Sequence, residues 1–104
     1  MASKRKKADT ELGKMILRNM AIVMERERER RGLTKRELVV ICEITPPYYF
    51  SILDGTANPS LQVMTRISTN LQVPLHELMT GSKLSDDQIQ LFTTPNRSTE
   101  LQKE

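Results

Sequence analysis

Apolar residues recur at helical spacing along most of this chain, and short segments rich in Gly, Pro, Asn, Ser and Thr separate the apolar stretches. The longest stripe advances in steps of three and four residues and consists of Leu12, Met15, Ile16, Met20, Val23 and Met24. Such steps place side chains on one face of an α-helix. Thr10 is a suitable N-cap and Gly32 a usual terminator, so we predict a first helix that runs to Arg31.

Four shorter helices are predicted after this long one. The sequence T-K-R-E at 34–37 is a capping box and opens the second helix. Thr45 caps the third, with Pro46 at the first helical position, where a missing N–H costs nothing. Ser60 caps the fourth helix, and Pro74 starts the fifth. Glycines that end the third and fifth helices follow at Gly55 and Gly81.

The pattern divides the chain into three parts. Residues 1–9 form a basic arm, residues 10–81 form one all-α domain of five helices, and residues 82–104 form a short polar tail. Within the tail, the capping box S-D-D-Q precedes Ile89, Leu91 and Phe92, which favours a short helix at 85–92 and disorder beyond it. A long first helix and a short tail are therefore expected around the central helices.

Charge is distributed unevenly between the two ends of the chain. Residues 1–36 hold 12 of the 16 Lys and Arg residues but 5 of the 13 acids, whereas the remainder carries more acids than bases. A basic first part indicates a polyanionic partner. Within it, the alternating segment at 25–31 pairs Glu27 with Arg31 and Glu25 with Arg28 at favourable helical spacing. We interpret this segment as a salt-bridged, solvent-exposed face.

Composition argues against several classes of protein. Aromatic residues make up 4% of the chain, so the core is small and an enzymatic cleft is not expected. Cys42 and His76 are the single cysteine and histidine, so neither a disulfide within the chain nor a metal or other cofactor site is expected. No apolar run could span a membrane, and the basic start lacks the apolar core of a secretory signal. We expect a cytoplasmic protein, with Cys42 in the core.

Two short helices joined by a tight turn, with a further helix packed behind, form a helix-turn-helix unit. The segments G-L-T-K-R-E-L-V at 32–39 and G-T-A-N-P-S-L-Q-V-M-T-R-I-S-T-N-L-Q-V-P-L-H-E-L-M at 55–79 resemble the lambda-repressor/Cro family, also called the Xre family. The resemblance covers about half the chain. It implies a lambda-repressor-like, five-helix DNA-binding domain that acts as a bacterial or phage transcriptional regulator, in particular a repressor.

The resemblance also implies which residues meet double-stranded DNA. The base-facing side of the third helix would consist of Thr45, Pro46, Pro47, Tyr48 and Ser51, while Tyr49 and Ile52 would be buried. Phosphate contacts would come from Arg28, Thr34, Lys35, Arg36, Thr56 and Asn58. The basic arm would add Lys4, Arg5, Lys6 and Lys7. A recognition helix is further expected to present unpaired N–H groups at its N-terminus. A homodimer is expected, with the fifth helix and Ile89, Leu91 and Phe92 at its interface.

Three departures from the family pattern affect this interpretation. The turn position usually held by Gly is Glu43, which must accept a positive φ or change the turn. The family acid that pairs with an Arg of the first helix is Leu53 here, which leaves Arg28 available for phosphate or for another acid. No Arg, Lys, Gln or Asn lies between Ile44 and Asp54, although bidentate reading of guanine or adenine requires such side chains.

Two hypotheses account for this lack of polar side chains. In the first, the third helix reads thymine methyl groups and DNA shape, and the basic arm supplies much of the affinity. In the second, the Pro-Pro-Tyr-Tyr-Phe surface at 46–50 binds a protein, so that the domain is an antitoxin-like or adaptor module.

Overall fold

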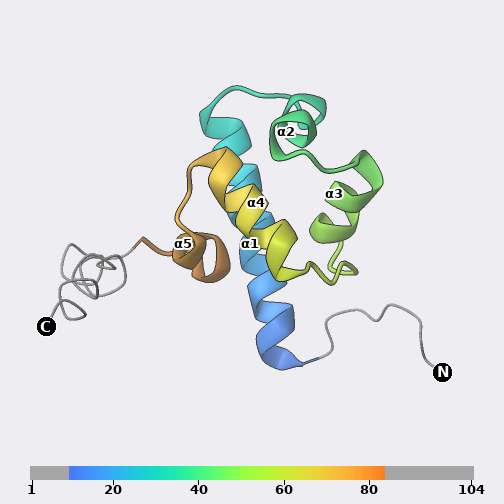
Figure 1. Cartoon of the computed structure of the whole chain (residues 1–104), viewed down its shortest axis with the longest axis vertical. Helices are drawn as coiled ribbons and strands as arrows, with labels where there is room; N and C mark the ends of the chain where they lie inside the picture. The colour runs from blue at the N-terminus through green and yellow to red at the C-terminus, as the bar shows by residue number, and fades with distance from the viewer. Residues whose placement is uncertain (1–9, 84–104) are drawn as a thin grey trace, which may run out of the picture.

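The computed structural model describes residues 10–83, and this part of the chain contains five α-helices (Figure 1). Their bounds are α1 Glu11–Arg30, α2 Lys35–Cys42, α3 Pro46–Leu53, α4 Leu61–Leu71 and α5 Leu75–Thr80. The all-α, five-helix prediction is therefore confirmed. The basic arm and the 85–92 segment lie outside the described residues.

Local capping signals explain why each of the first four helices begins where it does. The side chains of Thr10, Thr34, Thr45 and Ser60 each accept a hydrogen bond from the backbone N–H three residues later. At Thr34 the box is reciprocal, because the Glu37 carboxylate accepts from the Thr34 N–H at 2.8 Å. These bonds satisfy donors that a helix start otherwise leaves unpaired.

The helices enclose one apolar core. In Figure 1, α1 and α4 lie in the centre, α5 lies on one side, and α2 and α3 lie on the other. Ten fully buried side chains form most of the core: Met20, Val23, Met24, Leu38, Cys42, Tyr49, Ile52, Ile67, Leu71 and Leu78. The core position predicted for Cys42 is confirmed, and its burial raises the pKa of the thiol to about 11. The helix-turn-helix pair is thus fixed to α1 and α4 through apolar contacts.

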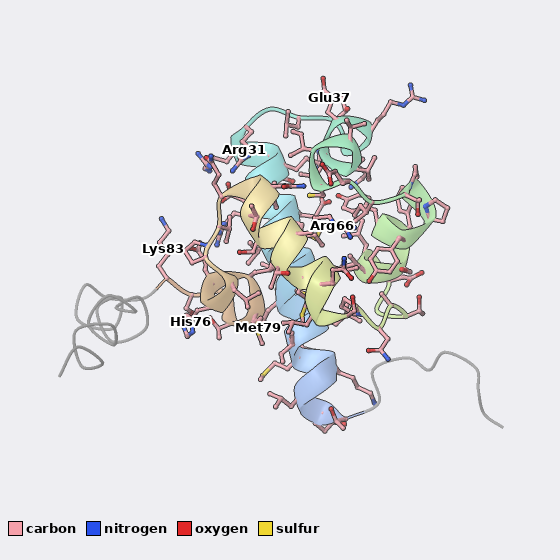
Figure 2. The ribbon with its side chains drawn as sticks, in the orientation of Figure 1. Arg31, Glu37, Arg66, His76, Met79 and Lys83 are labelled. Atoms are coloured by element: carbon pink, nitrogen blue, oxygen red, sulfur yellow. The ribbon has the colours of Figure 1, made fainter. Side chains whose placement is uncertain are left out.

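The turn between α2 and α3 keeps its shape although it lacks glycine. Glu43 adopts φ 60° and ψ 45°, the left-handed conformation that usually requires Gly. Its N–H donates to the Val40 carbonyl, and Arg66 from α4 donates to its carbonyl at 3.4 Å (Figure 2). Of the two outcomes expected for Glu43, the structure therefore shows the first, a positive φ in an unchanged turn.

Segment 25–31 is not simply a solvent-exposed face. The carboxylate of Glu27 is 7% exposed and forms ion pairs with three arginines, Arg26, Arg30 and Arg31. Arg26 also pairs with Glu77 of α5, and Arg31 donates to the Leu71 carbonyl at the end of α4 (Figure 2). That part of the prediction was wrong, because Glu27 continues the buried stripe of α1 and holds Arg26 and Arg31, which in turn contact α5 and α4. The expected pairs of Glu27 with Arg31 and of Glu25 with Arg28 are present.

Candidate nucleic-acid interface

The N-terminal ends of α2 and α3 meet in one groove at the edge of the domain. The groove has a volume of about 240 Å³ and is lined by Lys35, Arg36, Val39, Pro46, Tyr49 and Phe50. The first three residues belong to α2 and the last three to α3. Two cationic side chains of one helix therefore lie beside the start of the next, which the sequence predicted to face DNA.

The predicted base-facing residues divide into two groups in the structure. Thr45, Pro46 and Pro47 are exposed, whereas Tyr48 and Ser51 are partly buried. The two residues expected on the other side, Tyr49 and Ile52, are buried with 0% and 1% exposure. The orientation of α3 therefore agrees with the predicted one.

The first four positions of α3 itself offer no unpaired backbone donor. Pro46 and Pro47 have no N–H, and the N–H groups of Tyr48 and Tyr49 donate to the side chain and the carbonyl of Thr45. The expectation of unpaired N–H groups at this end was wrong, because prolines occupy the first two helical positions and the cap satisfies the next two. A phosphate bound here would gain no backbone hydrogen bond from α3.

The small hydroxyls of α3 are also committed to its own backbone. The Thr45 hydroxyl oxygen accepts the Tyr48 N–H at 3.2 Å, and the Ser51 hydroxyl donates to the Tyr48 carbonyl at 2.6 Å. Thr45 can still donate and Ser51 can still accept, but each has lost one of its roles. The exposed surface of α3 is therefore largely the apolar surface of proline and aromatic rings.

The N-terminus of α2 has the opposite character. Thr34, Lys35 and Arg36 are all exposed. The backbone N–H groups of Lys35 and Arg36 make no hydrogen bond within residues 10–83, since the cap bonds begin at Glu37. Two N–H donors, two cationic side chains and the positive end of the helix dipole point outward together, an arrangement suited to binding an anion.

Lys35 and Arg36 differ in their partners. The Lys35 Nζ lies 3.1 Å from the Glu25 Oε1 of α1 and 5.6 Å from the centre of the Tyr49 ring. Arg36 forms no ion pair within residues 10–83. Arg36 is therefore available to an incoming anion, whereas Lys35 must first leave Glu25.

Arg28 is held inside the domain. Its guanidinium donates twice to the Glu25 carboxylate, at 3.0 and 3.1 Å, and once to the Leu33 carbonyl at 2.8 Å. Its side chain is 19% exposed. Arg28 thus pairs with an acid of its own helix in place of the family acid, whose position is occupied by Leu53. Its geometry is that of a brace between α1 and the loop before α2.

The remaining predicted phosphate contacts lie in two places. Thr56 and Asn58 are exposed in the loop after α3, where the Thr56 hydroxyl donates to Asp54 at 2.7 Å. Lys4, Arg5, Lys6 and Lys7 lie outside the described residues. Of the predicted contacts, the structure brings Lys35 and Arg36 together with Pro46 in one groove. Phosphate binding by the arm stays a prediction.

Two residues of this site were not among the predicted DNA contacts. Phe50 was expected only in the alternative protein-binding surface; it is 49% exposed and lines the groove, with its ring 5.5 Å from that of Tyr49. Glu25 holds both Lys35 and Arg28. The pair with Lys35 joins residues ten apart on two helices, so helical spacing gave no signal for it.

Two further observations concern the described part of the chain. No helix within residues 10–83 is long and apolar enough to cross a membrane. Over the same range, no group of three or more His, Cys, Asp or Glu side chains could hold a metal ion.

Comparisons with known proteins agree with this architecture. A family model described as helix-turn-helix matches residues 24–78. Among curated proteins, the chain is similar to the HTH-type transcriptional regulator DdrOP3 of Deinococcus deserti, with 28% identity over 61 residues. That match covers 59% of this chain and 47% of the relative, so the chain spans about half of the relative's length. No solved structure matches the chain.

Proposed function

The chain belongs to the lambda-repressor-like helix-turn-helix family, and we propose that it is a sequence-selective DNA-binding regulator that represses transcription in a bacterium or a phage. The observation that carries the proposal is the groove in which Lys35 and Arg36 lie beside the exposed start of α3. The regulator named in the comparison supports the same function at the level of the family.

The two helices would divide the work of binding. The N-terminus of α2, with two unpaired N–H groups and Arg36, would hold a phosphate of the DNA backbone. This contact would set the position of α3 in the major groove, with Thr45, Pro46, Pro47 and Tyr48 directed at the bases. Rigid apolar rings would then recognise thymine methyl groups and the shape of the groove. Phe50 would extend this apolar surface.

Further contacts would raise affinity and specificity. Thr56 and Asn58 would approach the backbone on the other side of α3, and Lys4 to Lys7 would add electrostatic attraction. Two copies bound to a palindrome about one helical turn apart would double the contact surface. Repression would follow from occupancy of a promoter by the dimer.

The decisive experiment is selection of genomic DNA fragments by the purified chain at physiological salt, followed by sequencing. We expect enrichment of a palindromic site, bound more tightly than unrelated DNA. Tyr48→Ala should reduce the preference for this site more than it reduces non-specific binding. Thr69→Ala is the control, because Thr69 is exposed on α4 and does not line the α2–α3 groove. Selection without any enriched sequence would refute sequence-selective binding.

The protein-binding alternative rests on a single observation, the exposure of Phe50. Tyr49 is buried and Tyr48 partly buried, so the exposed run of rings that the sequence suggested reduces mainly to Phe50 and two prolines. Phe50→Ala separates the two functions. An antitoxin-like module would lose a protein partner and keep its DNA affinity, whereas our proposal requires a loss of affinity for the selected site.

A further inference from the structure

A second groove lies between α1 and the C-terminal end of α3. It has a volume of about 470 Å³. Its floor is apolar and includes Leu17 and Ile52, which are buried, and Ala21 and Leu53, which are partly buried. Ile22 forms part of the rim and is 55% exposed, although it is a large aliphatic residue. An apolar groove with an exposed Ile at its edge is suited to covering by further apolar side chains.

The rim of the same groove is cationic. Lys14 and Arg18 line it one helical turn apart on α1. Arg18 makes no ion pair within residues 10–83, and Lys14 has only a 3.8 Å pair with the highly exposed Glu11. The acid on the opposite wall, Asp54, accepts two hydrogen bonds from Thr56. An occupant that combines apolar side chains with carboxylates would match both the floor and the rim.

The segment 85–92 of this chain has that composition. It reads S-D-D-Q-I-Q-L-F, so Asp86 and Asp87 stand shortly before three large apolar residues, Ile89, Leu91 and Phe92. In this respect the segment is complementary to the groove: apolar side chains for the floor and two carboxylates for Arg18 and Lys14. It also favours a helix start, at which acids are stabilising.

The described part of the chain ends beside the helix that forms one wall of the groove. Asn19 of α1 donates to the Met79 carbonyl at 3.0 Å, and a Cβ on Gly81 would lie 3.7 Å from the Asn19 Oδ1. Asn19 directly follows Arg18, so the chain leaves α5 against the same turn of α1. From Gly81 to Ser85, four extended residues span roughly 13–14 Å. From Ser85 to Ile89 a helical segment adds about 6 Å. Half the circumference of a helix is only about 16–19 Å.

We infer that residues 85–92 of this chain bind in the groove between α1 and the end of α3. Ile89, Leu91 and Phe92 cover the apolar floor beside Ile22, and Asp86 and Asp87 pair with Arg18 and Lys14. The segment packs behind the recognition helix and supports its C-terminal end, which makes it a sixth helix of the domain. This inference does not depend on DNA binding.

Disulfide trapping in the 104-residue chain tests the assignment. Ile22→Cys places a thiol on the rim of the groove, and Gln90→Cys places one in the segment without removing an apolar anchor. Thr69→Cys with Gln90→Cys is the matched control, because Thr69 is exposed on α4, away from the groove. The native Cys42 can stay, since its thiol is buried and its pKa is raised. Oxidised glutathione serves as the oxidant, at about 1 μM protein, where a tethered pair far outcompetes pairs between chains.

We expect the 22–90 pair to form a disulfide within one chain several times faster than the 69–90 pair. Adding Ile89→Ser and Phe92→Ser should lower its rate to that of the control. Equal rates for the two pairs would mean that the segment only collides with the domain, which overturns the inference. Covalent dimers as the main product would assign the groove to a second copy and overturn it as well.

A charge exchange tests the rim separately from the floor. Arg18→Glu should slow formation of the 22–90 disulfide, and further replacement of Asp86 and Asp87 by Arg should restore the rate. If Arg18→Glu leaves the rate unchanged, or if the exchanged chain stays slow, the carboxylates do not pair with this rim and the orientation inferred for the segment is wrong.

Discussion

Arg36→Gln should weaken DNA binding and reduce its dependence on salt. Arg36 is exposed at the start of α2 and has no ion pair within the described residues, so it can meet a phosphate without breaking another contact. Each phosphate neutralised contributes about 0.9 to the slope of log affinity against log salt. When the salt concentration rises fourfold, a variant that lacks one phosphate contact should therefore lose roughly threefold to fourfold less affinity than the wild type loses.

Lys35→Gln should have a smaller effect, although Lys35 is the neighbouring cation. Its Nζ lies 3.1 Å from Glu25, with its side chain 44% exposed, so part of its attraction for phosphate is offset by the lost pair. Glu25→Gln removes the competing charge and keeps the shape of the side chain. We expect this variant to bind DNA more tightly than the wild type and to have a steeper salt slope.

Fluorescence anisotropy with one labelled duplex, between about 50 and 200 mM KCl, measures both quantities. Lys83→Gln is the control, because Lys83 is exposed near α5, on the far side of the domain from α2 and α3 (Figure 2). Thermal unfolding of each variant shows that it is folded. If Lys35→Gln flattens the slope as much as Arg36→Gln and Glu25→Gln has no effect, the ion pair with Glu25 does not compete with DNA and the reasoning fails.

Three further predictions concern stability. Tyr49→Phe should raise the free energy of unfolding by about 1 kcal/mol, since the buried hydroxyl has no hydrogen-bond partner within residues 10–83. A lower free energy of unfolding in urea titrations would mean that the hydroxyl does have a partner. Glu43→Gly should stabilise by about 0.5–1 kcal/mol and Glu43→Ala should not, because φ is 60°. The hydrogen bond from Arg30 lowers the pKa of the Glu27 carboxyl in the folded chain, against the opposing effect of desolvation. Ionised Glu27 therefore stabilises the fold fully above pH 4.5, the ordinary pKa of the group, and this stabilisation is lost as the pH falls through the folded pKa. The free energy of unfolding of Glu27→Gln, measured against pH, should lack this decrease in acid.

The elements that the sequence predicted correctly rest on local interactions. The caps at Thr10, Thr34, Thr45 and Ser60 depend on bonds over three residues, so their positions follow from the sequence alone. The burial of Glu27 does not, because it depends on how α4 and α5 pack against α1. An alternating charge pattern gives no indication of which acid continues the apolar stripe once the helices assemble.

The same distinction applies to the candidate site. The exposed side of α3 was identified through the family resemblance, which placed Tyr49 and Ile52 on the buried side. The sequence did not reveal that Glu25 holds Lys35, since that contact joins two helices. It also led us to expect unpaired N–H groups on α3. Two prolines and a bonded cap remove them, a result that required combining the proline positions with the capping geometry.

These findings separate affinity from specificity in the proposed complex. Between Ile44 and Asp54 the chain has no charged or amide side chain, and the start of α3 has no unpaired N–H. Attraction to phosphate must therefore come from α2, the loop after α3 and the arm, none of which distinguishes one base from another. Discrimination falls to prolines and aromatic rings, whose fixed shapes lose little freedom on binding. Such a surface can exclude a badly fitting groove, but it cannot form bidentate bonds with guanine or adenine. Binding should therefore depend steeply on salt and rank sites by methyl pattern and groove shape.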